Sequence, residues 1–183
     1  MRLVSARKQL GMTLIEALVA FFILAAGILG AISMEASVKK GSFDAMQRSL
    51  ASSLAQDIIE RMRANDGTGS FLTAYNGTFG SGALTQPANL CNNAASLCTA
   101  AQIATADLYQ WEQALLGKTS VTSDGSNIGG LVNPTGCINY NAAQVTVVIS
   151  WQSRTATVDG ASDVTCGTAS ANRRQISVTM HIY

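Results

Sequence analysis

The most prominent feature of the sequence is a long apolar run near its N-terminus. Residues 17–32 carry no polar side chain, and the run extends to a 21-residue window, 14–34, whose polar members are Glu16 and Ser33. About 20 apolar residues in a helix span the hydrocarbon core of a bilayer. We therefore expect residues 12–34 to form a membrane-spanning helix.

The apolar pattern continues past this run with the period of an α-helix. Apolar side chains recur at spacings of three and four, at Phe43, Met46, Leu50, Leu54, Ile58 and Met62. Acid-to-base pairs four residues apart support the same helix, at Glu35–Lys39, Asp44–Arg48 and Asp57–Arg61. Asn65-Asp66-Gly67 is a stop signal. Residues 35–65 thus predict an amphipathic half, and the whole helix runs from about Thr13 to Ala64, roughly 80 Å at 1.5 Å per residue.

Residues 66–183 predict a soluble domain that contains a second, shorter helix. Residues 67–82 are rich in glycine and small polar residues, which indicates an exposed loop that Tyr75 and Phe79 pin. Residues 99–116 follow with one apolar face, capped by Thr99 or Thr105. Residues 120–136 are again polar and glycine-rich, which predicts another loop.

Two strands are expected in the last third of the chain. Residues 144–152 and 173–183 alternate between apolar and polar side chains, which is typical of strands with one buried face. Residues 154–159 are a weaker candidate for a third, short strand. An antiparallel sheet with one apolar face would pack on the apolar stripe of the long helix, which gives an α+β fold.

Composition and charge exclude several classes of function. The net charge of +1 gives no support for a nucleic-acid partner. The single histidine excludes a two-histidine metal site, and no phosphate- or dinucleotide-binding motif is present. We therefore expect no metal, no cofactor and no small-molecule substrate, and we expect that the protein is not an enzyme.

Candidate catalytic groups are weak. His181 would need a serine beside it to form a nucleophile–base pair, and Ser150, Ser153 and Ser177 are candidates only because serine is abundant. An exposed surface histidine is the simpler interpretation. The neighbouring carboxylates Asp57 and Glu60 likewise indicate a solvated helix face.

The four cysteines favour two disulfides if the domain lies in an oxidising compartment. They contain no C-x-x-C pair, and three connectivities are open to Cys91, Cys98, Cys137 and Cys166. Loop closure favours near neighbours, so Cys91–Cys98 and Cys137–Cys166 is the preferred pairing. Free buried thiols are the alternative.

Residues 1–11 form a basic leader in front of the apolar run. Arg2, Arg7 and Lys8 are its charged residues, and their positive charge favours retention in the cytoplasm. Glu16 is the residue that a plain signal anchor does not explain, because a carboxylate at membrane depth is costly and indicates a function. An interfacial glutamate that reaches headgroup water is the alternative.

The sequence Gly11-Met12-Thr13-Leu14-Ile15-Glu16 resembles the class III signal of type IV pilins and pseudopilins. The resemblance implies cleavage between Gly11 and Met12 by prepilin peptidase, N-methylation of Met12, and a role for Thr13 and Glu16 in subunit assembly. It also implies the pilin fold, a long N-terminal helix packed on an antiparallel sheet. Glu16 would then meet the amine of Met12 in its own or a neighbouring subunit. Loss of the leader takes the net charge to −2.

The run Ala55–Asn65, the helix segment Asp107–Trp111 and the valine-rich strand that ends in tryptophan resemble the PilV-like minor pilins, also called type IV pilus modification proteins. The resemblance implies assembly with other minor pilins and the major pilin, priming of the pilus at or near its tip, and support of adhesion and twitching motility. The implied location is the inner membrane, with residues 66–183 in the periplasm, and then the extracellular pilus. The alternatives are a minor pseudopilin of type II secretion and, in another class, a signal-anchored periplasmic enzyme or binding domain.

Overall fold

The computed structural model of the chain describes residues 13–65, 71–93, 97–156 and 166–182. By its contacts the chain divides into two units, residues 1–41 and residues 42–183. One element, helix α1 (Leu14–Ala64), contributes to both. The helix predicted from about Thr13 to Ala64 is therefore confirmed, and Thr13 precedes its first residue.

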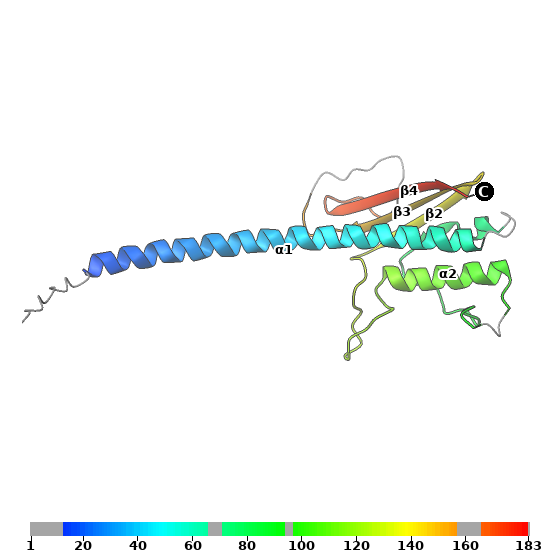
Figure 1. Ribbon diagram of the computed structural model, residues 1–183, viewed down its shortest axis with the longest axis horizontal. Coiled ribbons are helices and arrows are strands. Elements are labelled where there is room, and N and C mark those ends of the chain that lie inside the picture. The colour runs from blue at the N-terminus through cyan, green and yellow to red at the C-terminus, as the bar shows by residue number, and fades with distance from the viewer. Residues whose placement is uncertain (1–12, 66–70, 94–96, 157–165, 183) are drawn as a thin grey trace, which may run out of the picture. The chain divides into compact units, whose positions relative to one another are not determined.

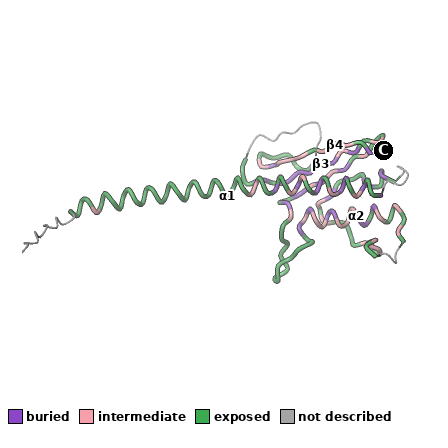
Figure 2. The backbone as a smooth tube through the Cα atoms, in the orientation of Figure 1, coloured by how far each residue is buried: buried purple, intermediate pink, exposed green. Residues whose placement is uncertain are grey.

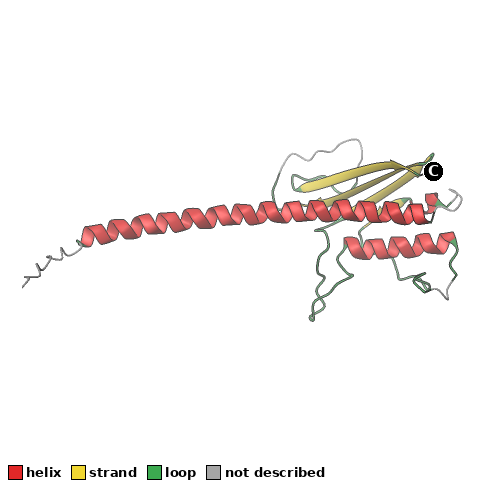
Figure 3. Ribbon diagram, viewed as in Figure 1, coloured by secondary structure: helices red, strands yellow, loops and turns green. Residues whose placement is uncertain are grey.

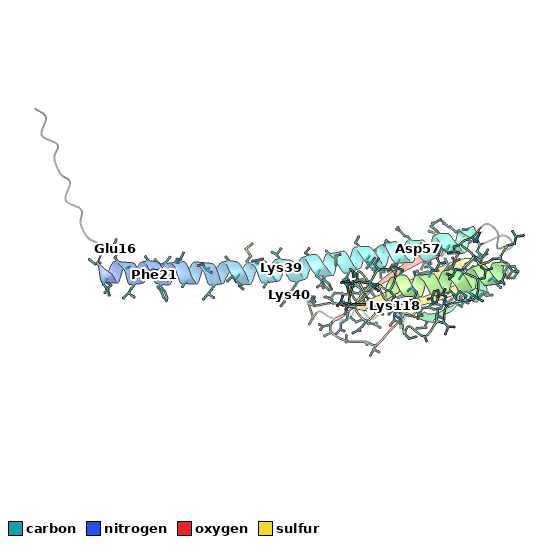
Figure 4. The ribbon with its side chains drawn as sticks, turned by 90° about the horizontal axis from the view of Figure 1, so that it is seen from below. Glu16, Phe21, Lys39, Lys40, Asp57 and Lys118 are labelled. Carbon is teal, nitrogen blue, oxygen red and sulfur yellow. A yellow bond between two sulfur atoms is a disulfide. The ribbon has the colours of Figure 1, made fainter. Side chains whose placement is uncertain are left out.

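The first unit consists, in its described part, of the N-terminal half of α1. Every residue from Leu18 to Gly41 is exposed, although most of them are apolar (Figure 2). The side chains of this half stand out from the helix, among them Phe21, which is 70% exposed (Figure 4). This half of the helix thus has no protein core of its own.

The second unit is an α+β domain built around the C-terminal half of α1. Its other elements are the short 3₁₀ helix η1 (Leu72–Tyr75), helix α2 (Ala100–Leu115) and strands β1 (Gly77–Phe79), β2 (Thr135–Asn141), β3 (Gln144–Gln152) and β4 (Arg173–His181). The strands form one antiparallel sheet in the order β1-β2-β3-β4 (Figures 1 and 3). The predicted α+β class, second helix and two long strands are confirmed.

The core of this unit lies where α1, α2 and the sheet meet. Strand β3 turns Val145, Val147, Ile149 and Trp151 inward, and all four are buried. Trp111 of α2 is fully buried and meets Phe79 edge to face, with ring centroids 5.8 Å apart. The expectation that Tyr75 and Phe79 pin the segment after α1 is confirmed, since both are buried.

The sequence missed two strands, and the short strand that it predicted at residues 154–159 is not formed in its described part. Residues 77–79 and 135–141 were expected within or near loops, but they form β1 and β2, which pair with each other. Residues 154–156 are not in a strand, and the remainder of the expected strand 154–159 lies outside the described residues. Strand β2 was missed because only Ile138 of its seven residues is a large, fully buried apolar residue.

The buried face of α1 also differs from the predicted stripe at its N-terminal end. Met46 is 57% exposed, whereas Gln47 is buried. The amide of Gln47 donates to Gly130 O at 3.3 Å and accepts from the Val132 N–H at 3.0 Å. A polar side chain therefore takes an inward position because its hydrogen bonds satisfy the backbone of an adjoining loop.

Candidate processing and assembly site

Thr13 begins the described chain and caps helix α1. Its Oγ1 accepts a hydrogen bond from the Glu16 N–H at 3.3 Å, and its carbonyl accepts from the N–H groups of Glu16 and Ala17. A threonine that accepts from the third following N–H is a typical N-cap. The expected cleavage residues Gly11 and Met12 lie outside the described residues.

Glu16 lies in the first turn of α1 and is exposed. A carboxylate is favoured at this end of a helix because the unsatisfied N–H groups carry partial positive charge. The side chain stands at the start of the helix, about six turns ahead of the basic pair Lys39 and Lys40 (Figure 4). The structure therefore places an accessible negative charge at the N-terminal end of an apolar helix.

The helix half that follows Glu16 presents an apolar surface. Its large exposed side chains are Leu18, Val19, Phe21, Phe22, Ile23, Leu24, Ile28, Leu29, Ile32, Met34 and Val38, and Leu14 and Ile15 ahead of Glu16 are exposed as well. In length and composition α1 can cross a membrane, and the apolar stretch that qualifies it has no residue buried in the protein. Such a surface needs lipid or other apolar helices around it.

In the second unit, α1 and α2 are joined by an ion-pair network. Arg61 donates from Nε to Asp57 Oδ2 at 2.9 Å, and from Nη1 to Asp107 Oδ1 at 3.1 Å and Gln110 Oε1 at 3.0 Å. Burial would lower the pKa of Arg61, but the charges of Asp57 and Asp107 outweigh it and raise that pKa. The guanidinium is thus a permanent cation that holds both helices.

Tyr75 and Asn65 extend this network to the end of α1. The Tyr75 hydroxyl donates to Asp107 Oδ2 at 2.7 Å, and Asn65 Nδ2 donates to the Tyr75 hydroxyl at 3.1 Å and to Ala100 O at 2.9 Å. Burial and the hydrogen bond to the Asp107 carboxylate raise the pKa of Tyr75. The residues that carried the PilV-like resemblance, Arg61, Asn65 and Asp107 among them, therefore meet in one helix–helix interface.

Glu112 has a role that the sequence did not reveal. It is buried, and its carboxylate accepts hydrogen bonds from the N–H groups of Gly80, Gly82 and Leu84 at 2.9, 3.2 and 3.0 Å. A buried carboxylate is stable where several donors satisfy it. In the sequence, the only indication of a buried carboxylate is that Glu112 directly follows Trp111 in the predicted helix.

The loop after β3 is fastened to the first residues of α1 in the second unit. The Arg154 guanidinium lies 4.2 Å above the Phe43 ring, and the backbone N–H of Arg154 donates to Asp44 Oδ1 at 3.1 Å. Burial is the largest single influence on the pKa of Asp44 and raises it, but the hydrogen bonds from Ser153, Arg154 and Thr155 and the charge of Arg174 together outweigh burial and lower that pKa. Asp44 therefore binds this loop, in place of the expected pair with Arg48.

Both disulfides join the cysteines that loop closure favoured. Cys91 pairs with Cys98, and Cys137 of β2 pairs with Cys166 in the segment before β4. Cys166 is fully buried and lies against Val148 of β3, with its sulfur 3.5 Å from the carbonyl oxygen of that residue. The second disulfide thus covers part of the sheet face opposite to α1.

The candidate catalytic residues are not brought together. Ser150 and Ser153 are buried, and His181 is exposed at the end of β4. Ser177 lies four residues from His181 on the same strand, which separates them by about 13 Å. Within the described residues no group of three potential metal ligands occurs. Glu60 pairs with Arg63 on an exposed face, whereas Asp57 belongs to the Arg61 network.

Two family profiles match adjoining parts of the chain. The prokaryotic N-terminal methylation motif matches residues 6–32, and the profile described as type IV pilin Tt1218 matches residues 33–109. No curated protein and no solved structure matches. Type IV pilins are structural proteins rather than enzymes. Together with the α+β fold, the two matches give this chain the processing motif and the architecture of a type IV pilin.

Proposed function

We propose that this pilin is a minor pilin of the PilV-like class, which assembles with other minor pilins to prime the type IV pilus at or near its tip. In this role it supports adhesion and twitching motility. The observation that carries the proposal is an exposed apolar helix directly behind a processing motif. The PilV-like run Ala55–Asn65 supports the finer assignment, because its Asp57, Arg61 and Asn65 hold α2 against α1.

The methylation motif at residues 6–32 supports processing of the chain. Prepilin peptidase cuts between Gly11 and Met12 and methylates the new amine of Met12. Thr13 caps the helix that follows the cut, so Glu16 stands in the first helical turn of the processed chain. In a filament core of low dielectric, an amine and a carboxylate attract strongly only as a pair, which favours one register between neighbouring helices.

The same helix supports a proposal for the location of the protein. Before assembly, residues 12–34 lie in the inner membrane with the α+β unit in the periplasm, and after assembly the helix packs among other pilin helices. The two disulfides support an oxidising compartment for that unit. The major pilin and the other minor pilins are the partners.

The first test is the intact mass and N-terminal residue of the protein from its native host, with and without prepilin peptidase. We expect N-methyl-Met12 in the presence of the peptidase and Met1 in its absence. An intact Met1 in both strains, or a cut beyond residue 34, would return the protein to the class of anchored periplasmic domains. Recovery of the processed chain with secretion pseudopili rather than pili would assign it to type II secretion.

A second test separates assembly from processing. Glu16→Gln should leave cleavage after Gly11 intact but prevent recovery of the protein in sheared pili, because the amine of Met12 loses its partner. Glu35→Gln is the matched control, since Glu35 forms an exposed pair with Lys39 on the same helix. Equal recovery of the two variants would rule out the assembly role of Glu16.

A further inference from the structure

We propose that the sheet face opposite to α1 carries a binding site for a neutral saccharide. The site is a hollow where β3 ends and β4 begins, and it lies wholly within the α+β unit. The inference deepens the proposed function, on whose adhesive role it rests, because it names the chemical class of ligand to which the pilin adheres.

The hollow has a volume of about 480 Å³, which is within the usual size range of small-molecule sites. Its polar lining comes from β2 and the residues before it, from β3, and from the segment that leads into β4, and includes Asn133, Thr135, Ser150, Gln152, Thr168 and Arg173. Among the described residues that line it there is no aspartate or glutamate. A cationic ligand would therefore find no partner there, whereas hydroxyl and amide groups are abundant.

The hydroxyls of Ser150 and Thr135 lie next to each other at this hollow. The two residues are directly opposite in the pairing of β3 with β2, so their side chains share one face of the sheet. Ser150 is 2% exposed, and within the described part of the chain neither hydroxyl forms a hydrogen bond. A buried hydroxyl without a partner is costly, and a hydroxyl of a ligand can supply that partner.

Gly167 keeps the space above the two hydroxyls open. A Cβ at this position would lie 2.5 Å from Ser150 Oγ and 3.2 Å from Thr135 Oγ1, and the φ of +78° also favours glycine. Arg173, which is 5% exposed, holds the segment by donating from Nη1 to the carbonyls of Cys166 and Gly167 at 2.7 and 3.0 Å. This side of the hollow is therefore fixed before a ligand binds, which lowers the entropic cost of binding.

Asn133 and Gln152 present an acceptor and a donor side by side at the same hollow. Asn133 Nδ2 donates to Gln152 Oε1 at 2.6 Å. This bond leaves Asn133 Oδ1 as an acceptor and Gln152 Nε2 as a donor, and among the described residues neither atom takes part in another hydrogen bond. Two adjacent hydroxyls of a sugar, one donating and the other accepting, match this pair, whereas a carboxylate could use only the donor.

The site offers hydrogen bonds but no aromatic platform. Trp151, between Ser150 and Gln152, turns its side chain to the opposite face of the sheet, where it is buried in the core. A single sugar held by hydrogen bonds that it exchanges for those with water binds weakly. We therefore expect affinity for one sugar ring in the millimolar range.

Saturation-transfer NMR of the full chain tests the site. The chain is held in a phosphocholine detergent, because the head group of a maltoside detergent is itself a saccharide. Glucose, galactose and N-acetylglucosamine are the neutral probes, and acetate is the anionic probe. We expect transfer to at least one neutral sugar. Preference for N-acetylglucosamine would indicate a cell-wall glycan as the source of the ligand, and preference for glucose or galactose would indicate a surface polysaccharide.

Matched serine variants locate the binding. Ser150→Ala removes one partner of the sugar and should weaken binding about fivefold, the equivalent of one hydrogen bond. Since this hydroxyl has no partner in the described part of the protein, the variant should unfold at the same temperature as the wild type. Ser177→Ala is the control and should not change binding, because Ser177 is exposed on the same sheet face but does not line the hollow.

The outcomes separate this site from the minor-pilin role. Transfer to acetate alone would assign the hollow to an anion, and transfer to no probe would leave it without a ligand, so that either result would overturn the saccharide site. Sugar binding by Ser150→Ala as tight as that by Ser177→Ala would overturn it as well. None of these results depends on processing or on filament assembly, so a failed minor-pilin function would instead appear as an intact Met1 or as absence from pili.

Discussion

Tyr75 and Asp107 are joined by a hydrogen bond of 2.7 Å from the phenol to Oδ2, although 32 residues separate them in the chain. The same carboxylate accepts from Arg61 through its other oxygen. One side chain of α2 therefore holds both the end of α1 and the 3₁₀ helix that follows it. Because Trp111 and Trp151 are the two tryptophans and both are buried in the α+β unit, their fluorescence reports its unfolding.

Asp107→Ala should lower the free energy of unfolding by about 2–4 kcal/mol, since it leaves Arg61 and Tyr75 without their shared acceptor. Denaturant titration of the full chain in detergent, followed by tryptophan fluorescence, measures this. The control is Glu60→Ala, which breaks the exposed pair with Arg63 and should change stability by less than about 0.5 kcal/mol. Similar losses of unfolding free energy in both variants would show that the Arg61–Asp107–Tyr75 network stabilises the fold no more than an exposed ion pair does.

Stability should fall at alkaline pH because of Tyr75. Burial and the Asp107 carboxylate raise its pKa above the ordinary value of 10.0, so the folded state favours the protonated phenol. This contribution is complete below pH 10 and declines as the pH rises above it, by up to about 1.4 kcal/mol per pH unit. Unfolding at a series of pH values measures the slope. Tyr75→Phe should flatten it, and Tyr109→Phe should keep the wild-type profile.

The two disulfides should differ in their contribution to stability. Cys137–Cys166 closes a loop of 29 residues and Cys91–Cys98 one of 7, for which loop entropy alone gives about 3.6 and about 2.4 kcal/mol. Cys166 is also fully buried, so its replacement leaves a cavity. The alanine double variants, compared by thermal unfolding, should therefore rank Cys137/Cys166 as the more destabilised. The opposite order would contradict this assignment.

Gly130→Ala should destabilise the base of the hairpin that residues 120–128 form after α2. The added Cβ would lie 2.4–2.7 Å from backbone atoms of Gly117 and Leu116. These atoms cannot move away from the Cβ unless the backbone itself shifts. We expect a loss of at least about 2 kcal/mol in unfolding free energy. Gly129→Ala is the control, because its Cβ meets nothing within 4 Å and only the positive φ of 86° costs about 1 kcal/mol. Equal losses would mean that the close approach is easily relieved.

The long helix, α2 and strand β3 could be predicted because each depends on a local pattern. Strand β3 has the expected limits, and α2 begins after Thr99, one of the two expected caps, which forms a capping box with Gln102. Strands β1 and β2 carry no such local pattern. Strand β1 has only three residues, and β2 has one large buried aliphatic side chain, so both strands depend on pairing with distant segments. The inward position of Gln47 depends on carbonyl and N–H groups more than 80 residues away.

The candidate site shows the same division. The processing motif is a contiguous string, so residues 11–16 could be recognised directly. The meeting of Asp57, Arg61 and Asn65 with Asp107 and Tyr75 could not, because each residue alone is a common polar side chain on a helix or loop. Glu112 was unremarkable in sequence for the same reason: its three donors come from a segment about 30 residues earlier.

The burial of Cys166 has a consequence for the timing of folding. Cys166 covers Val148 only when its chain segment is held to β2, and Arg173 donates to the Cys166 carbonyl at 2.7 Å from the first residue of β4. In a reducing compartment this cover would be held by the hydrogen bonds from Arg173 to the carbonyls of Cys166 and Gly167, without the covalent link to β2. The covalent hold on this cover is therefore gained only on oxidation, so we expect the α+β unit to reach its full stability after export rather than in a reducing compartment.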